Sequence, residues 1–381
     1  MAEPQAGAGR PTRAHIDLDA VRANYARACA LACGRSVIAV VKADAYGHGA
    51  VPVSAALARA GATWLAVANV GEAAELREAL PSLHILVLGG VLSEAEADAA
   101  AELGLVPVLH HEGQRALVSR VAQRRGICVD VHVEIDTGMR RLGVPEAEGV
   151  ELLERVAAEP GLRLGGVLTH FAHADEPDVE LRTEPLARFR ALLAQARDRG
   201  IEPGLVHVAN SAALLSFHET LEALPEQGAV RPGIMLYGVN PAPHVDAGLR
   251  PVMTLRTEIM ALRSVAQGDA VGYAGTHRAA QATRIATLPL GYADGVPWSL
   301  GNCGVALLNG RRVPMVGRVS MDLVTLDVGD GPAEIGDEVI LFGVGQGTAL
   351  PVEEVAQTAG TLSYELLVRV GRRVPRVYEG D

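Results

Sequence analysis

Hydrophobic and polar positions along roughly the first 240 residues follow two patterns in turn. Short apolar runs rich in β-branched residues predict buried parallel strands. Between them, apolar residues recur at the spacing of a helix face. The predicted strands are Val37–Val41, Trp64–Ala68, Ile85–Leu88, Leu105–Leu109, Val129–Ile135, Gly166–Thr169, Leu205–Val208 and Val230–Ile234. The predicted helices include Asp19–Leu31, with Asp19 as N-cap, Val51–Arg59, Glu72–Leu80, Glu94–Leu103, Gln114–Arg124, Glu148–Ala158 and Pro185–Arg199.

This alternation indicates the α/β class, with a parallel eightfold β/α barrel (a TIM barrel). An open doubly wound sheet is the competing fold, but no Gly-x-Gly-x-x-Gly follows the first predicted strand.

Beyond about Asn240 helical spacing gives way to strict alternation, which predicts short strands and a helix at Val352–Thr358. Asn309-Gly310 is a strong hairpin signal. The predicted strands are Thr254–Leu262, Arg284–Leu288, Gly304–Leu308, Val313–Val316, Leu323–Val328 and Glu338–Phe342. We therefore predict a flexible N-terminus over residues 1–13, a barrel over 14–244 and a smaller, mainly-β C-terminal domain over 245–381.

Polar residues interrupt the barrel pattern at or just after the ends of predicted strands. In a barrel these carboxyl ends converge on the face that carries the chemistry of such enzymes. His110 taken by itself is best explained as a structural polar residue. Seven such residues together predict an active site on this face of the barrel. The seven are Lys42, His110, Asp136, Arg141, His170, Asn210 and Arg231.

Composition narrows the function classes. Hydrophobic residues make up 49% and charged residues 21%, as in a globular protein, and the net charge of -11 argues against nucleic-acid binding. The scattered cysteines, Cys29, Cys33, Cys128 and Cys303, predict free and mostly buried thiols rather than a zinc site, and we expect no metal. The N-terminus has no apolar signal region and no stretch is long enough to span a membrane, so we expect a cytoplasmic protein.

Lys42 gives the first indication of the chemistry. A lysine at the carboxyl end of a buried strand is partly desolvated, which lowers its pKa and frees a neutral amine for Schiff-base chemistry. Position alone favours the simpler interpretation, a lysine that caps a strand with its charge in water. The surrounding segment Val40–Gly49 changes that balance, because it closely resembles the pyridoxal-phosphate lysine motif of bacterial alanine racemases. The resemblance continues along nearly the whole chain.

The resemblance implies pyridoxal 5'-phosphate as cofactor and a set of residues that hold it. Asn210-Ser211 opens a helical stretch that offers a hydroxyl to an anion, although Ser211 alone could be a helix cap. Gly233 allows close approach of backbone N–H groups to a phosphate. The family's phosphate ligands match Tyr46, Ser211, Gly233, Ile234 and Tyr364. His170 matches the histidine that packs on the cofactor ring, and Arg141 matches the arginine at its phenolic oxygen.

Arg231 resembles the family arginine that faces the pyridine nitrogen. A guanidinium is not a proton source near neutrality, so that nitrogen stays unprotonated and the ring is a weaker electron sink. We infer that transamination and decarboxylation are restrained and that proton exchange at Cα dominates.

Racemisation needs a base on each face of a planar carbanion. The resemblance assigns these roles to Lys42 and Tyr273, and it implies a homodimer in which the tyrosine serves the partner's site. A phenol of ordinary pKa is a poor base at neutral pH, so its surroundings must assist it. Substrate-binding positions match Arg141, Met321, Asp322 and, at the entrance, Tyr292.

Two positions depart from the family pattern. Glu134 stands where many members have a carbamylated lysine, and we expect it to supply the negative charge that orients Arg141, through a water or through Arg140. Trp298 stands where many members have an arginine near the entrance.

The function implied is interconversion of L- and D-alanine for peptidoglycan. Trp298 keeps open a racemase of other substrate choice, such as serine. A non-enzymatic cofactor-binding barrel would lack the β domain with Tyr273, Met321 and Asp322. Decarboxylases with a similar barrel pair the pyridine nitrogen with a carboxylate, so Arg231 argues against them.

Overall fold

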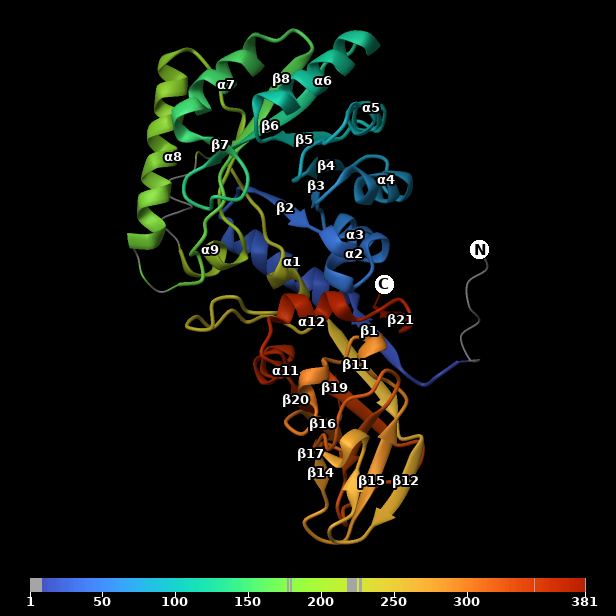
Figure 1. Cartoon of the computed structure of the whole chain (residues 1–381). Coiled ribbons are helices and arrows are strands. Elements are labelled where there is room, and N and C mark those ends of the chain that lie inside the picture. Colours follow the sequence, from blue (N-terminus) through green and yellow to red (C-terminus); the bar gives the residue numbers. More distant parts are fainter. Residues whose placement is uncertain are drawn as a thin grey trace. The chain divides into compact units, whose positions relative to one another are not determined.

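The computed structural model describes residues 9–176, 178, 180–217, 225, 228–345 and 347–380, and it divides the chain into two compact units (Figure 1). The barrel unit comprises Val21–Ala45 and Ala50–Arg250. The β unit comprises Met1–Ala20, Tyr46–Gly49 and Pro251–Asp381.

The barrel unit is a closed parallel barrel, as predicted. Its strands are β2 (Ser36–Val40), β3 (Trp64–Val67), β4 (His84–Val87), β5 (Val106–Leu109), β6 (Val129–Asp136), β8 (Leu162–Leu168), β9 (Leu205–His207) and β10 (Ala229–Val230). They pair in chain order, β10 pairs with β2, and the β5–β6 pairing completes the ring. A two-residue strand, β7 (Val144–Pro145), lies beside β6.

The helices of the barrel unit lie outside its strands (Figure 1). Local capping explains several of their ends. Asn69 and Ser93 cap two helices by accepting hydrogen bonds from backbone N–H groups, and Gly126 ends a third with a φ of 65°. Besides α1 (Leu18–Leu31) and α2 (Lys42–Gly47), the helices in the described part of this unit are α3 (Ala50–Arg59), α4 (Val70–Ala79), α5 (Glu94–Glu102), α6 (Glu112–Arg125), α7 (Glu146–Ala158), α8 (Glu180–Asp198) and α9 (Ser211–Ser216).

Two local predictions were wrong. Helix α1 (Leu18–Leu31) is capped by Asp17, whose Oδ1 accepts from the Ala20 N–H at 2.8 Å, and Asp19 lies inside the helix. The strand predicted over Val230–Ile234 ends at Val230, because Pro232 has no N–H to donate to a ladder. Ile234 instead begins the 3-10 helix η1 (Ile234–Tyr237).

In the residues that the structure describes, the β unit contains three sheets. The largest has the order β17-β16-β19-β11-β1-β21, with β20 attached to β19, and the second has the order β12-β15-β18. The third is the pair β13 (Ala270–Val271) and β14 (His277–Arg278). The other strands are β1 (Arg13–Asp17), β11 (Met253–Glu258), β12 (Ala261–Val265), β15 (Thr283–Leu288), β16 (Val305–Leu308), β17 (Arg311–Pro314), β18 (Val324–Asp327), β19 (Glu338–Gly345), β20 (Thr348–Leu350) and β21 (Arg376–Glu379). Two helices, α11 (Val352–Ala359) and α12 (Ser363–Arg369), follow β20.

The hairpin at Asn309-Gly310 is confirmed. Leu308 pairs with Arg311, and the two turn residues have φ of 51° and 74°, the positive values of a type I′ turn. The single strand predicted over Thr254–Leu262 is instead two, β11 and β12.

The N-terminal segment differs from the prediction of a flexible arm over residues 1–13. Residues 1–8 lie outside the described part of the chain. From residue 9 onward the chain has defined contacts: Thr12 is buried and its hydroxyl lies 2.9 Å from that of Thr257. Strand β1 pairs with β11 and β21, so residues 14–20 group with the β unit and not with the barrel. The units divide between Arg250 and Pro251, later than the predicted boundary at 244/245.

The cysteines are free, as expected, but all four are exposed and not mostly buried. Among the helices of the described residues, none combines the length and the apolar character that a membrane span requires.

Candidate active site

Lys42 follows β2 and opens an unusual backbone turn. Ala43, Asp44, Ala45 and Tyr46 have φ between 52° and 55°, so the short helix α2 (Lys42–Gly47) is left-handed over these residues. None of the four is glycine, and a left-handed conformation costs each about 1–2 kcal/mol. Strain of this kind persists only where surrounding contacts hold it, and such places are often functional.

The surroundings of Lys42 favour a neutral amine. Its side chain is half-buried, and burial lowers the pKa of the ammonium group. The Arg141 guanidinium lowers this pKa further, whereas the Glu72 carboxylate opposes both effects. A lowered pKa increases the fraction of free amine near neutral pH, which is the form that reacts with carbonyl carbon.

Arg231 is buried directly after β10 and is fixed by a dense set of hydrogen bonds. Its NH1 group donates to the Nδ1 of His207 at 3.0 Å and to the backbone oxygen of the same residue at 2.7 Å. Its NH2 group donates to the backbone oxygens of Thr169 at 2.8 Å and Val208 at 3.3 Å, and to the Nδ1 of His170 at 3.3 Å. Within the described residues Nε makes no hydrogen bond. Burial lowers the pKa of Arg231 to about 10, which leaves it cationic at neutral pH.

A chain of neutral histidines extends from Arg231 into the barrel. Because Arg231 donates to Nδ1 of His207, neutral His207 carries its proton on Nε2 and donates it to Nδ1 of His132, 2.8 Å away. Burial lowers the pKa of His132 to about 3 and that of His207 well below its usual value. His170 also has a pKa of about 3, first because of burial and then because of Arg231, Arg141 and Lys42. The sequence analysis missed His132 and His207, because both lie within predicted strands, Val129–Ile135 and Leu205–Val208, and do not follow their ends.

Two of the residues predicted to bind the phosphate, Ser211 and Gly233, lie in hydrogen-bond contact. Asn210 is the N-cap of α9, with its Oδ1 accepting from the Ala213 N–H at 3.0 Å, so the cap role considered for Ser211 belongs to Asn210. The buried Ser211 hydroxyl accepts from the Gly233 N–H at 2.8 Å and joins the start of α9 to the start of η1.

Glu134 faces His110. Its Oε2 lies 3.4 Å from Nδ1 of His110, whose Nε2 lies 2.9 Å from the backbone oxygen of Leu88. Burial raises the pKa of Glu134, while Arg231 and Arg141 act in the opposite direction. Arg141 is exposed, and in the described part of the chain it makes no hydrogen bond with Glu134. The orientation of Arg141 by Glu134 therefore stays a prediction. The electrostatic effect of Arg141 on the pKa of Glu134 supports it.

The remaining predicted residues belong to the β unit. Tyr46 is buried and its ring centroid lies 6.1 Å from that of Tyr364. Burial, and then Tyr364, raise the pKa of Tyr46. Tyr273 opens the 3-10 helix η2 (Tyr273–Gly275) after Gly272, which has a φ of 73°, and 71% of its surface is exposed.

The β-unit residues predicted to bind substrate or line the entrance are also exposed. Tyr292 begins the 3-10 helix η3 (Tyr292–Asp294), and this segment is tied to the Met321 segment by a hydrogen bond from the Ala293 N–H to the Met321 backbone oxygen at 3.1 Å. Asp322 forms an ion pair with Arg373 at 2.6 Å. Trp298 is exposed, with the Arg318 guanidinium 5.7 Å from its ring.

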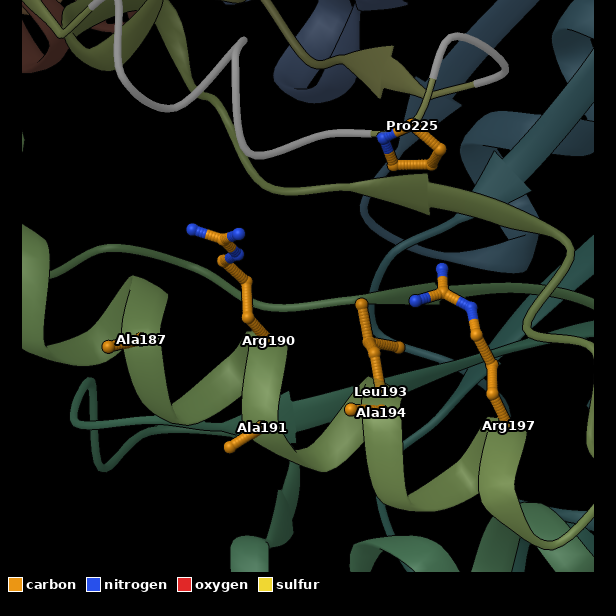
Figure 2. A pocket seen from close by; sticks show the side chains of 7 residues that line it. All are labelled: Ala187, Arg190, Ala191, Leu193, Ala194, Arg197 and Pro225. Carbon is orange, nitrogen blue, oxygen red and sulfur yellow. The ribbon is translucent and has the colours of Figure 1, made fainter.

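A cavity of about 600 Å³ lies elsewhere in the barrel unit, along the outer helix α8 (Figure 2). Arg190, Leu193 and Arg197 extend from the helix toward it, and Pro225 lies on its other side. None of the predicted site residues lines this cavity, so it is separate from the candidate site.

Comparison with known proteins identifies the family. The alanine racemase N-terminal domain matches residues 16–241, and the alanine racemase C-terminal domain matches residues 252–378. The chain belongs to the alanine racemase family. Members of this family are isomerases. In the sequence, the division between Arg250 and Pro251 falls between the two matched ranges.

Similar members of the alanine racemase family cover almost the whole chain. An alanine racemase of Desulforamulus reducens is 43% identical over 97% of this chain and 99% of its own. The crystal structure of an alanine racemase from Streptomyces lavendulae is 36% identical, with a TM-score of 0.91 over 98% of each chain. The Bartonella henselae alanine racemase, solved with covalently bound pyridoxal phosphate, is 30% identical, with a TM-score of 0.88 over 97% of this chain and 100% of its own.

Proposed function

We propose that this protein is a pyridoxal-phosphate-dependent alanine racemase that interconverts L- and D-alanine. The observation that carries the proposal is the half-buried Lys42 at the end of β2, with its lowered pKa, in the same unit as the buried Arg231 network. Family membership along the whole chain agrees with it. Supply of D-alanine for peptidoglycan in the cytoplasm is the physiological role that we include in the proposal.

The donor set of the barrel unit fits this cofactor. Lys42 offers an amine whose charged form is disfavoured, and Arg231 offers a cationic guanidinium whose Nε is not used by the described residues. Ser211, Gly233 and Ile234 lie together at the starts of α9 and η1, where we place the phosphate. We further assign Asn210, Arg141 and His170 to the cofactor from the barrel unit, and Tyr46 and Tyr364 from the β unit. The covalently bound pyridoxal phosphate of the Bartonella henselae relative supports this choice.

The cofactor, when bound, withdraws electrons from the substrate and acidifies its Cα proton. The chain's own residues then determine the outcome. Arg231 cannot give a proton to a neighbouring nitrogen at neutral pH, because even its lowered pKa is about 10. This restrains electron withdrawal and favours return of the proton to Cα over loss of other groups. His170, which is neutral at pH 7, adds no charge beside it.

Two proton carriers are required for inversion. We assign Lys42 to one face of Cα and Tyr273 to the other. The exposed Tyr273 would act in the active site of a partner subunit, so the proposal includes a homodimer with composite sites. Arg141, Met321 and Asp322 would hold the substrate carboxylate, and Tyr292 would line the entrance.

The test is formation of D-alanine from L-alanine by the purified protein with added pyridoxal phosphate, measured with chiral chromatography. We expect turnover in both directions to the same equimolar mixture. A protein that binds the cofactor but leaves alanine unchanged would refute the proposed substrate. The exposed Trp298 favours serine as the second candidate, so the same assay is run with L-serine.

A further inference from the structure

Glu72 links the turn after Lys42 to the next strand of the barrel. It lies in the first turn of α4, and its Oε1 accepts from the Ala43 N–H at 2.9 Å. Its Oε2 accepts from the Ala68 N–H at 2.8 Å. A single carboxylate therefore joins the residue after Lys42 to the residue after β3. Hydrogen bonds from N–H groups to a charged acceptor are stronger than those between neutral groups.

Ordinary helix capping does not account for this arrangement. At the start of α4 the cap is Asn69, whose Oδ1 accepts from the Glu72 N–H at 3.0 Å. In a capping box the glutamate at this position would return a bond to the N–H of the cap residue. Here both carboxylate oxygens instead bond to other segments, and one of these is the left-handed turn.

The left-handed turn needs such support. Its residues have strained φ values, and a hydrogen bond from the Ala45 N–H to the Val41 backbone oxygen, at 2.9 Å, joins its start to the end of the preceding strand segment. Asp44 supports the far end, where its Oδ1 accepts from the Ala50 N–H at 2.6 Å. Glu72 supports the near end, next to Lys42.

Charge gives Glu72 a second effect on Lys42. The charged groups that act on Lys42 are Arg141, which follows β6, and Glu72, which projects from α4. His170, after β8, is neutral at pH 7, and Arg231 acts on it together with Lys42. Glu72 is the one anion of this group, so it limits how far the pKa of Lys42 falls.

We propose that Glu72 is a positioning residue for Lys42: it holds the left-handed turn that presents the amine, and it supplies the negative charge beside it. The proposal rests on the proposed function in one respect, that Lys42 is the lysine which carries the chemistry. Glu72 is not among the residues that we assign to the cofactor or the substrate, and its carboxylate accepts from the backbone N–H groups of Ala43 and Ala68.

The experiment measures the amine of Lys42 directly. Full-length protein without added cofactor is acylated briefly over a range of pH, and modification of the Lys42 peptide is measured with mass spectrometry. We expect Glu72→Gln to move the midpoint of reactivity to lower pH, because removal of a nearby anion destabilises the ammonium form. Glu72→Asp keeps the charge, so its midpoint should stay closer to that of the parent. The matched control is Glu75→Gln, an exposed residue of the same helix, which should change nothing.

The holoenzyme provides the second measurement. Loss of the bridge should let the turn relax, and a shift of about 1 Å in a reacting group lowers the rate by up to roughly a hundredfold. We expect Glu72→Gln and Glu72→Asp to lower kcat at least about tenfold with little change in KM, and Glu75→Gln to match the parent. If Glu72→Gln does not fold, Glu72→Asp still tests the bridge, since it shortens the side chain.

A parent-like midpoint and parent-like kcat in Glu72→Gln would overturn the proposal. So would an equal midpoint shift in Glu75→Gln, which would show a general effect of net charge. A parent protein that fails to racemise alanine would refute the proposed function instead, while the acylation midpoints would still decide the role of Glu72.

Discussion

Apart from the exposed Arg141 of the barrel unit and the buried Tyr46 of the β unit, the two units present their candidate residues in opposite ways. In the barrel unit Arg231 is 4% exposed and bonds to backbone and histidine partners at the ends of β8 and β9. Glu134 and the two neutral histidines inside strands are buried, Lys42 is half-buried, and the pKa values of all of them are shifted. In the β unit Tyr273 is 71% exposed and Met321 is 52% exposed.

The difference shows two ways in which one chain can prepare a site. The barrel residues are preorganised by their own unit, so their geometry and protonation are fixed before any ligand arrives. The exposed residues of the β unit can be reached by another molecule, and their chemistry depends on what covers them. Mutations in the barrel unit should therefore affect both structure and function, whereas mutations at the exposed tyrosine should affect function alone.

Lys42→Ala tests the barrel side with the largest expected effect. Removal of a proton carrier alone costs about 10²–10⁴-fold in rate, and here the covalent hold on the cofactor is lost as well. We expect racemisation to fall at least about 10³-fold and the visible absorbance of the bound cofactor to disappear. Both are measured on the same sample, and retention of either would contradict the assignment of Lys42.

Tyr273→Phe tests the β unit. Loss of the phenol should lower the racemisation rate about 10²-fold, because one face of Cα has no proton carrier. Since the side chain is exposed, the melting temperature and the cofactor absorbance should match those of the parent. A variant with full activity would remove Tyr273 from the mechanism, and one that lost stability would contradict the contrast between the two units.

Acid should destabilise the barrel through its buried histidines. The folded-state pKa of His132 is about 3 and that of His207 is also lowered, so unfolded chains bind more protons below pH 6.5. The free energy of unfolding is therefore fully retained above pH 6.5 and declines as pH falls toward the folded-state pKa, by about 1.4 kcal/mol per pH unit for each histidine. Urea unfolding at pH 7.5, 6.5 and 5.5 measures the decline.

His132→Asn provides the control for that measurement. In this variant the free energy of unfolding should decline less between pH 6.5 and 5.5. The difference from the parent should be the contribution of one histidine, about 1.4 kcal/mol per pH unit. An unchanged slope would mean that His132 is not the neutral, buried group that its contacts indicate.

Glu134→Gln should have the smallest effect. If the charge of Glu134 orients Arg141, removal of that charge should displace the guanidinium. We expect activity and cofactor affinity to fall roughly tenfold, because small displacements of a positioning group lower the rate. Glu148→Gln, an exposed residue of α7, is the matched control. Parent-like values for Glu134→Gln would show that the contact with His110, and not charge on Arg141, is what this residue provides.

The sequence predicted the barrel because short, mostly apolar strand segments alternate regularly with segments of helical spacing. It also predicted that Lys42 and His170 follow strand ends, and the structure places them after β2 and β8. Arg231 follows β10 because that strand ends earlier than predicted. Short-range signals were sufficient in these cases, as they were for the Asn309-Gly310 turn.

Other features depend on information that local patterns do not contain. The pairing of Ala14 with Arg376 joins residues near opposite ends of the chain, and local patterns do not reveal it. For the same reason the predicted start of the barrel, at residue 14, was wrong. The left-handed turn contains no glycine at Ala43, Asp44 or Ala45, and tertiary contacts such as that of Glu72 hold it. Tyr273 was chosen by resemblance, because its neighbours indicate nothing beyond a turn.

The most direct test of the central claim is reaction of L-alanine with the pyridoxal-phosphate-loaded protein in deuterated water. Two proton carriers on opposite faces predict that D-alanine forms with deuterium at Cα, and that Lys42→Ala and Tyr273→Phe each suppress it. Proton NMR and chiral chromatography measure exchange and inversion separately. Inversion at the parent rate in Tyr273→Phe, or an alanine Cα proton that never exchanges in the presence of the parent protein, would contradict the account.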